Sequence, residues 1–228
     1  YQKWMLKKEY SKTTVSLYTR SIRKIFNSQI RAGSINNDLY PFGKGKYEIP
    51  KSQNIKKALS ITDIAKIFKY EPMEGTPEHY YRDLWIFIYM CNGINVKDIC
   101  LLKYSNIKGD TIEYDRAKTA RKNFKPISIT ILPETKQIID RWGTKPIKPN
   151  KYIFPVLKKN MNPETQQKVI KQLTKQINKY IKRIAGKVGI VGNISSYTAR
   201  HSYATILMRS GTSIAFISQA LGHSNIST

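Results

Sequence analysis

Acidic residues are scarce in this sequence of 228 residues. Fifteen Asp and Glu stand against 40 Lys and Arg, which gives a formal net charge of +25. A surface with that excess repels itself unless it meets a polyanion. Nucleic acid is the partner that the composition favours, because phosphate contacts release counterions; an anionic membrane surface is the weaker alternative. Hydrophobic residues make up 40% of the chain, which excludes a disordered basic tail and allows one large domain or two small ones.

Cysteine, histidine and long apolar runs are also rare. The two cysteines, Cys91 and Cys100, provide no disulfide framework. With the three histidines they form no metal-ligand spacing, so we expect no metal and no cofactor. The longest apolar stretch, Leu84–Cys91, is far shorter than the roughly 20 residues that span a bilayer, and no secretory signal opens the chain. The composition therefore predicts a cytoplasmic protein, with no membrane partner, that binds nucleic acid.

Apolar periodicity predicts a mainly helical fold. Spacings of three and four indicate helices over residues 13–32, 96–104, 133–143, about 163–186, 198–209 and 213–221. Two more helices have start signals: Ser60 with Asp63 resembles a capping box, and Thr76-Pro77 opens an apolar helix that runs towards Gly93. Alternating patterns at 111–115 and 126–132 predict two strands joined by the charged hairpin Arg116–Lys125. The expected fold class is mainly α with a small antiparallel β-sheet (α+β).

A stretch rich in Pro, Gly and Lys, Tyr40–Lys57, interrupts the helical pattern. We interpret it as the connection between two domains, because these residues favour turns and loops. An ordinary long loop is the alternative. A basic linker between two lobes suits a protein that closes around a rod.

One arginine stands out near the end of the chain. The segment SSYTARHSYATILMRSG, Ser195–Gly211, places Arg200 close to the start of an amphipathic helix. The helix dipole is positive there, so a cation is unfavourable unless an anion such as a phosphate lies beside it. A guanidinium holds two phosphate oxygens at once. On position alone, an exposed arginine beside a loop is an equally good interpretation.

Four segments together resemble the motifs of the tyrosine recombinases, the family of lambda-type phage and transposon integrases. YTARHSYATILMRSG resembles H-x-L-R-H-x-F-A-T-x-L-x-x-x-G, and ISQALGHSNIST resembles I-x-x-x-L-G-H-x-x-I-x-T. CNGINVKDICLLKYSNI resembles T-G-x-R-x-x-E-L-x-x-L-x-x-x-D-I, and RAKTARKNFKPISI resembles the strand–turn–strand that carries K-T. Each match alone is weak, but all four follow the family's order and rough spacing.

The resemblance implies a C-shaped clamp built from two domains. Residues 1–52 would be part of a helical, SAM-like core-binding domain, 53–58 a linker, and 59–228 a recombinase catalytic domain that is incomplete at its C-terminus. The implied partner is double-stranded DNA. The family assembles as a homotetramer on paired sites, with a monomer as the alternative for this chain in solution.

The implied function is site-specific recombination, the DNA integration of a bacterial mobile element without a metal. A tyrosine attacks a DNA phosphate and becomes linked to the 3′ end, and the 5′-hydroxyl of a second strand reverses the step. Negative charge builds up on the phosphate in each step. Cations and hydrogen-bond donors held around that phosphate therefore supply most of the catalysis.

Position in the motifs assigns roles to three residues. Arg200 would hold non-bridging oxygens, Lys118 would donate a proton to the leaving 5′-oxygen, and His223 would donate a hydrogen bond to the phosphate. The alternatives are a solvated loop lysine for Lys118 and a helix-terminal histidine for His223. His201 matches no catalytic position of the family, and we expect it to be structural.

Two positions depart from the family pattern. Asn95 stands where the first arginine belongs, and losing one such contact typically costs roughly 10²–10³ in rate. Tyr197 replaces the first histidine, and a phenol with a pKa of about 10 is a poor base. A subgroup of mobile-element integrases also lacks the first arginine. Our hypothesis is that a nearby cation replaces it, with Arg116, Arg121 and Lys97 as candidates.

The remaining candidates support the site or bind DNA. Asp98 matches the acidic residue that follows the missing arginine; it either buttresses the site or faces a neighbouring lysine on its helix. The basic residues expected on DNA, besides the three candidate cations, are Lys125, Arg20, Arg23 and Lys24.

The nucleophile is the largest gap. No tyrosine follows Tyr203, which lies on the apolar side of its helix. We expect the nucleophile beyond Thr228, so that the chain as given binds DNA without cutting it.

Two alternatives stay open. One is a non-catalytic, repressor-like or architectural DNA-binding protein on the same scaffold. Asn95 and Tyr197 favour it, whereas Lys118, Arg200 and His223 oppose it. The other is a basic ribosome-associated protein, which would explain the charge but not the ordered motifs.

Overall fold

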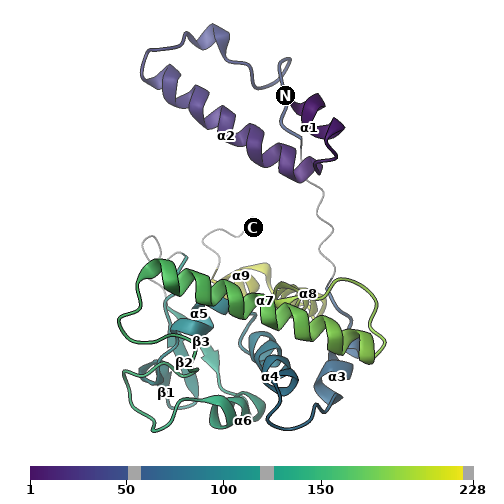
Figure 1. Ribbon diagram of the computed structural model, residues 1–228, viewed down its shortest axis with the longest axis vertical. Coiled ribbons are helices and arrows are strands. Elements are labelled where there is room, and N and C mark those ends of the chain that lie inside the picture. Colours follow the sequence, from purple (N-terminus) through teal and green to yellow (C-terminus); the bar gives the residue numbers. More distant parts are fainter. Residues whose placement is uncertain (51–57, 119–125, 223–228) are drawn as a thin grey trace. The chain divides into compact units, whose positions relative to one another are not determined.

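A computed structural model describes residues 1–50, 58–118 and 126–222, and the chain forms two compact units (Figure 1). Unit 1 comprises Tyr1–Ile55 and unit 2 comprises Lys56–Thr228. Helices dominate, and the strands form one small antiparallel sheet, so the expected fold class is confirmed. Within the described ranges, no helix has the length and apolar character needed to cross a membrane.

Unit 1 is built on one long helix. It contains α1 (Gln2–Lys7), α2 (Lys12–Arg31) and the 3-10 helix η1 (Asn37–Leu39). The Ser11 side chain caps α2 by accepting from the Thr14 amide at 3.1 Å, which satisfies one amide of the first turn. Phe42 is buried against the rings of Phe26 and Tyr47. The first part of the Pro-, Gly- and Lys-rich stretch therefore belongs to this unit.

Unit 2 contains the remaining helices and the sheet. Its elements are α3 (Ile61–Lys69), α4 (Pro77–Met90), α5 (Val96–Leu101), the 3-10 helix η2 (Tyr104–Asn106), β1 (Ile107–Lys108), β2 (Thr111–Tyr114), β3 (Ile127–Thr130), α6 (Pro133–Trp142), α7 (Pro163–Lys187), α8 (Ser196–Arg209) and α9 (Ile214–Ala220). The helices match the predicted ones to within a few residues. The predicted start signals are confirmed, since Ser60 caps α3 and Thr76 caps α4.

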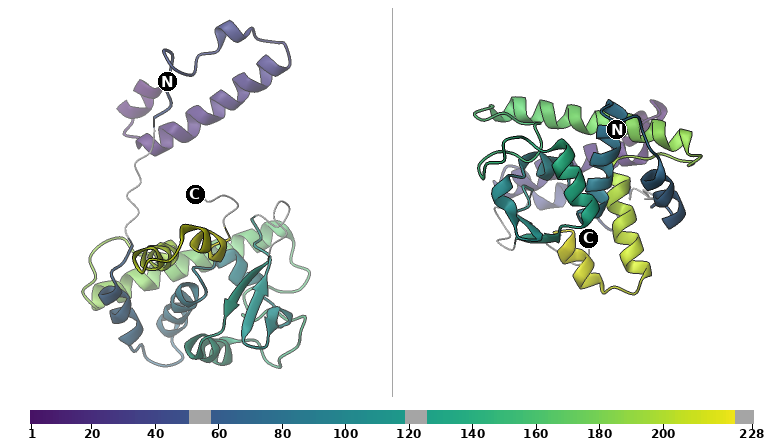
Figure 2. Two further views of the ribbon diagram at one scale, coloured as in Figure 1. Left: turned by 180° about the vertical axis from the view of Figure 1, so that it is seen from behind. Right: turned by 90° about the horizontal axis from the view of Figure 1, so that it is seen from below.

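The sheet has the order β1-β2-β3, and neighbouring strands run antiparallel. Tyr114 pairs with Ile127, so the hairpin between β2 and β3 begins directly at Asp115. Arg116 and Lys118 therefore follow the end of a paired strand. Figure 2 shows α9 beside β3, on the side of unit 2 that also carries α8.

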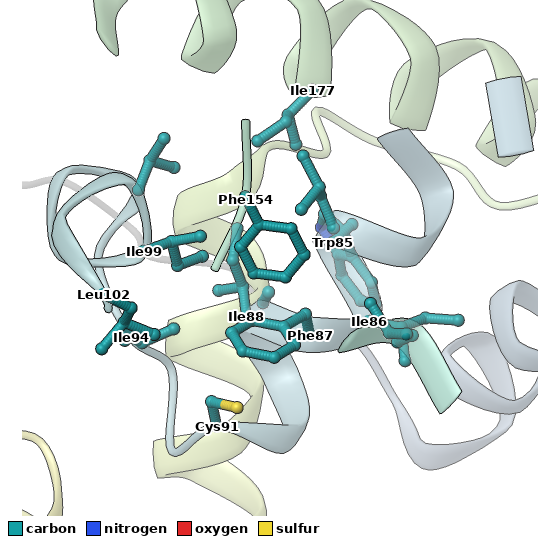
Figure 3. Packing of buried hydrophobic residues seen from close by; sticks show 14 of the residues in the cluster. Trp85, Ile86, Phe87, Ile88, Cys91, Ile94, Ile99, Leu102, Phe154 and Ile177 are labelled. Atoms are coloured by element: carbon teal, nitrogen blue, oxygen red, sulfur yellow. The ribbon is translucent and has the colours of Figure 1, made fainter. Parts of the chain in front are cut away.

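Helix α4 forms the centre of unit 2. It packs against α6, α7 and α8, and its residues Trp85, Phe87 and Ile88 are almost fully buried (Figure 3). Phe154 and Ile177 reach into the same cluster. Burying an apolar side chain of this size stabilises a fold by roughly 1.5–3 kcal/mol, which makes α4 a rigid base for the segments that it contacts.

Candidate active site

Three hydrogen bonds fix the start of the helix that carries Arg200. Ser195 accepts from the Thr198 amide at 3.3 Å, and the Thr198 hydroxyl accepts from the Ser195 amide at 3.1 Å, which is a capping box. The Trp85 indole donates to the Ser195 carbonyl at 3.0 Å and so ties this helix start to the core. Arg200 consequently lies in the second turn of α8, where it is only 7% exposed.

The Arg200 guanidinium joins three segments of unit 2. Its Nη1 donates to the Gly93 carbonyl at 2.6 Å, and its Nη2 donates to the Leu221 carbonyl at 2.5 Å. Gly93 lies in the turn after α4 and Leu221 at the end of α9. Burial, and after it the charge of Arg116, lowers the pKa of Arg200 to about 10. The charged form is therefore disfavoured where it stands, and an anion beside it would be favourable.

Two glycines allow the backbone to approach these arginines. Gly93 has φ +65°, and a Cβ there would lie 2.8 Å from both Cα and Cγ of Arg200. Gly222 has φ +64°, and a Cβ there would lie 2.4 Å from Cδ1 of Ile127 and 3.2 Å from Cδ of Arg116. Only glycine combines positive φ with such close contact. At each position the glycine carbonyl accepts a hydrogen bond from one of these guanidinium groups, at 2.6 Å.

Arg116 lies at the same turn. Its Nη1 donates to the Gly222 carbonyl at 2.6 Å, next to the Leu221 carbonyl that Arg200 holds. Its Nε is buried and has no acceptor among the residues that the structure describes. A buried guanidinium N–H without an acceptor is costly, so this group favours a further hydrogen-bond acceptor in its vicinity.

Asp98 supplies the negative charge of the cluster. It is 4% exposed; its Oδ1 accepts from the Ala117 amide at 2.9 Å and its Oδ2 from Asn95 Nδ2 at 3.4 Å. Burial raises the pKa of Asp98, although these two bonds and the charges of Arg116 and Arg200 act against that rise. Its side chain therefore links the turn at Asn95 to the start of the hairpin at Ala117.

The cluster has an excess of positive charge. Arg200 and Arg116 bring two guanidinium groups, and within the described part of the chain Asp98 is the one carboxylate whose charge acts on the pKa of Arg200. Tyr114 lies in the same field, and burial raises the pKa of its phenol, so it stays neutral at physiological pH. Two cations against one anion in a poorly solvated position favour the binding of an anion such as a phosphate.

The other sequence candidates fall into different places. Tyr197 is 55% exposed in the first turn of α8, packs edge-on against His201, and lies close enough to affect the pKa of Arg200. Lys118 is exposed in the turn after β2, and Lys97 is exposed on α5. Tyr203 is partly buried and donates to Asn92 Oδ1 at 2.7 Å, which is a packing position.

Some candidates cannot be related to this cluster. His223, Arg121 and Lys125 lie outside the described residues. Arg20, Arg23 and Lys24 are exposed on α2 of unit 1. The cluster itself therefore consists of Arg200, Arg116, Asp98, Asn95 and Tyr197.

Sequence reasoning missed a row of lysines on α7. Lys168, Lys171, Lys175, Lys179 and Lys182 are all exposed, at spacings of three and four. They lie opposite the buried residues of the same helix, Leu173, Ile177, Ile181 and Ile184. From Lys168 to Lys182 the helix rises by 14 residue steps, or about 21 Å at 1.5 Å per residue. The spacing was visible in the sequence and would have identified this face.

Known proteins resemble this chain in sequence. Residues 57–228 match the profile of the phage integrase family. A tyrosine recombinase from Thermosipho africanus is 28% identical over 218 residues, which cover 95% of this chain and 69% of the relative. The tyrosine recombinase XerD from Listeria innocua is 26% identical over 227 residues, which cover 96% of this chain and 70% of the relative.

Solved structures share the fold. The integrase of transposon Tn1549, in complex with a circular intermediate DNA, superimposes with a TM-score of 0.68 at 17% identity and covers 99% of this chain and 76% of its own. The lambda integrase bound to DNA gives a TM-score of 0.62 at 17% identity, with coverages of 97% and 74%.

Proposed function

Since the chain belongs to the phage integrase family, whose matched relatives are tyrosine recombinases, we propose that it serves the site-specific integration and excision of a mobile element. The observation that carries the proposal is the cluster around Arg200. A guanidinium that is buried, short of counter-charge and held by carbonyls from two other segments is prepared to bind one phosphate. Double-stranded DNA is the polyanion that fits a chain with a net charge of +25.

The proposed chemistry is the transfer of one phosphoryl group. A tyrosine oxygen attacks the phosphorus, the bond from phosphorus to the 5′-oxygen breaks, and the tyrosine proton passes to solvent. Arg200 binds non-bridging oxygens, and Lys118 gives its proton to the leaving 5′-oxygen. Tyr197 and His223 donate hydrogen bonds to the same phosphate. The attacking tyrosine is the one group of this reaction that we do not assign to a residue of the sequence.

DNA binding is assigned to the lysine row of α7, together with the basic residues of α2 and of the hairpin. Double-stranded DNA carries a phosphate about every 3.4 Å along each strand, so about 21 Å of helix faces several phosphates. A row of flexible ammonium groups binds such a backbone without reading the base sequence. We further propose that protomers assemble as a homotetramer on paired sites, as the family resemblance implies.

The lysine row is tested by salt dependence. Replacing Lys171, Lys175 and Lys179 by glutamine should reduce the slope of log K against log salt by about 0.9 for each phosphate that is no longer neutralised, or about 2.7 in all. The affinity should fall similarly on all DNA sequences. The matched control replaces three exposed lysines of other segments, Lys136, Lys145 and Lys148. An equal change in both variants would mean that only net charge matters, not the row.

The enzymatic proposal is tested with a nicked suicide DNA substrate and the full-length protein. Wild type should form a covalent protein–DNA adduct, and Arg200→Lys should form it far more slowly, because an ammonium lacks the planar fork. Arg209→Lys, at the exposed end of the same helix, is the matched control and should react like wild type. Thermal unfolding of each variant separates an effect on the chemistry from an effect on folding.

The second candidate is a non-catalytic DNA-binding protein on the same scaffold. Asn95 and Tyr197 favour it, because neither brings the charge or basicity of the residue it replaces in the family motif. The suicide substrate distinguishes the two: tight DNA binding without any adduct would identify the non-catalytic protein.

A further inference from the structure

Asn95 stands where the family pattern has an arginine, so this position brings no positive charge. Asn95 immediately precedes α5, and its amide donates to Asp98 Oδ2 at 3.4 Å, so it faces the arginine cluster but adds no charge. Arg116 brings a full positive charge to the same cluster from the other side, at the end of β2. We propose that Arg116 is the second guanidinium that binds the scissile phosphate beside Arg200, an inference that rests on the proposed function.

The first support is the shared anchor of the two arginines. Arg200 and Arg116 hold the carbonyls of consecutive residues, Leu221 and Gly222, at 2.5 and 2.6 Å. The Cα atoms of consecutive residues are about 3.8 Å apart, so both guanidinium groups meet at one turn. The charge of Arg116 also acts on the pKa of Arg200, which agrees with two guanidinium groups that lie near each other.

The second support is the unused capacity of Arg116. Its Nε is buried without an acceptor in the described part of the chain, while Nη1 is bound. Asp98 accepts from the amide of Ala117, the next residue, and so fixes the backbone from which the Arg116 side chain extends. A fixed backbone and a buried Nε–H without an acceptor suit a side chain that binds an anionic ligand.

The other candidate cations carry less support. Lys97 is exposed on α5 and neighbours the buried Asp98 along the chain, which places it about 100° around the helix from the cluster. Arg121 lies outside the described residues.

The competing explanation is that Arg116 only stabilises the turn at Gly222, through its hydrogen bond to the Gly222 carbonyl. Arg116→Gln separates the two roles, because the glutamine amide still donates a hydrogen bond to a carbonyl but carries no charge. A chemically altered substrate provides a second, independent comparison. A methylphosphonate at the scissile position replaces one charged oxygen by a neutral methyl group and thereby reduces the need for a second cation.

The experiment measures the rate of covalent adduct formation by the full-length protein on two suicide substrates, one with the normal phosphate and one with the methylphosphonate. Arg116→Gln should lose roughly 10²–10³ in rate on the phosphate, the usual cost of removing one such interaction. On the methylphosphonate the variant should approach the wild-type rate. Arg209→Gln, at the exposed end of α8, is the matched control and should react like wild type on both substrates.

Two results would overturn the inference. An unchanged rate on the phosphate would mean that Arg116 does not touch it. An equal loss on both substrates would mean that Arg116 only holds the turn. In either case a strong loss with Arg200→Lys would leave the proposed function standing, whereas no adduct with wild type would remove the proposed function itself.

Discussion

Replacing Gly93 by alanine tests whether the turn after α4 packs in close contact with the helix that carries Arg200. The residue has φ +65°, and the added Cβ would lie 2.8 Å from Cα and Cγ of Arg200. One of these atoms is backbone and the other belongs to a side chain that is only 7% exposed. Neither has room to move away, so the strain must appear as a loss of stability.

The expected loss has two parts. The left-handed backbone conformation costs a residue with a Cβ roughly 1–2 kcal/mol. Overpacking of a well-packed interior adds about 1–3 kcal/mol. Gly93→Ala should therefore reduce the free energy of unfolding by about 2–5 kcal/mol. Gly189→Ala is the matched control, because Gly189 has φ +69° and a Cβ there would meet nothing within 4 Å. Gly189→Ala should lose only the cost of the left-handed conformation, roughly 1–2 kcal/mol.

The assay is urea unfolding of the chain in a Trp4→Phe background, so that the fluorescence comes from Trp85 and Trp142, with linear extrapolation to water. Both tryptophans belong to unit 2. Gly93→Ala should be less stable than Gly189→Ala by about 1–3 kcal/mol, the overpacking part. Equal losses in the two variants would refute the close approach between Gly93 and Arg200.

Two other side chains give predictions of a different kind. Burial raises the pKa of Asp98 above its unfolded value of 3.8, so the folded state binds a proton more readily and Asp98 stabilises less as the pH rises through that window. Wild type should therefore gain stability relative to Asp98→Asn as the pH falls from neutral towards about 4 in urea titrations; a constant difference would contradict the shift. Asp83 is fully buried and accepts from Arg82, Arg141 and Trp142 at 2.9, 2.6 and 2.8 Å. Asp83→Ala should lower the free energy of unfolding by about 3–5 kcal/mol, because it leaves buried donors and charge unpaired, whereas Glu164→Ala, in an exposed pair with Lys168, should unfold like wild type.

The helical frame was predictable from the sequence because its signals are local. The apolar stripe of α7 and the start signals Ser60 and Thr76 specify their elements without help from distant residues. The strand β1 was missed, since two residues show no periodicity. On α2, Tyr18 and Ile25 share the predicted apolar stripe but are 49% and 61% exposed, so periodicity alone overstated the buried face there.

The surroundings of Arg200 were less predictable. The helix dipole indicated that the guanidinium needs a negative partner, and the structure places carbonyl oxygens of Gly93 and Leu221 there. Gly93 lies 107 positions from Arg200 and Leu221 lies 21 positions from it, so the three meet only through tertiary packing. The same holds for Arg116 and Gly222, whose contact no local pattern encodes. The motifs predicted the site residues, and the fold showed which of the described ones lie together.

The most direct test of the account is the position of the phosphate in a crystal structure of the protein bound to its DNA. The account predicts one phosphodiester with its oxygens within hydrogen-bond distance, about 3 Å, of the guanidinium nitrogens of both Arg200 and Arg116, and with Lys118 facing the 5′-oxygen. A complex in which DNA is bound and the nearest phosphate lies beyond the reach of Arg200 would contradict it.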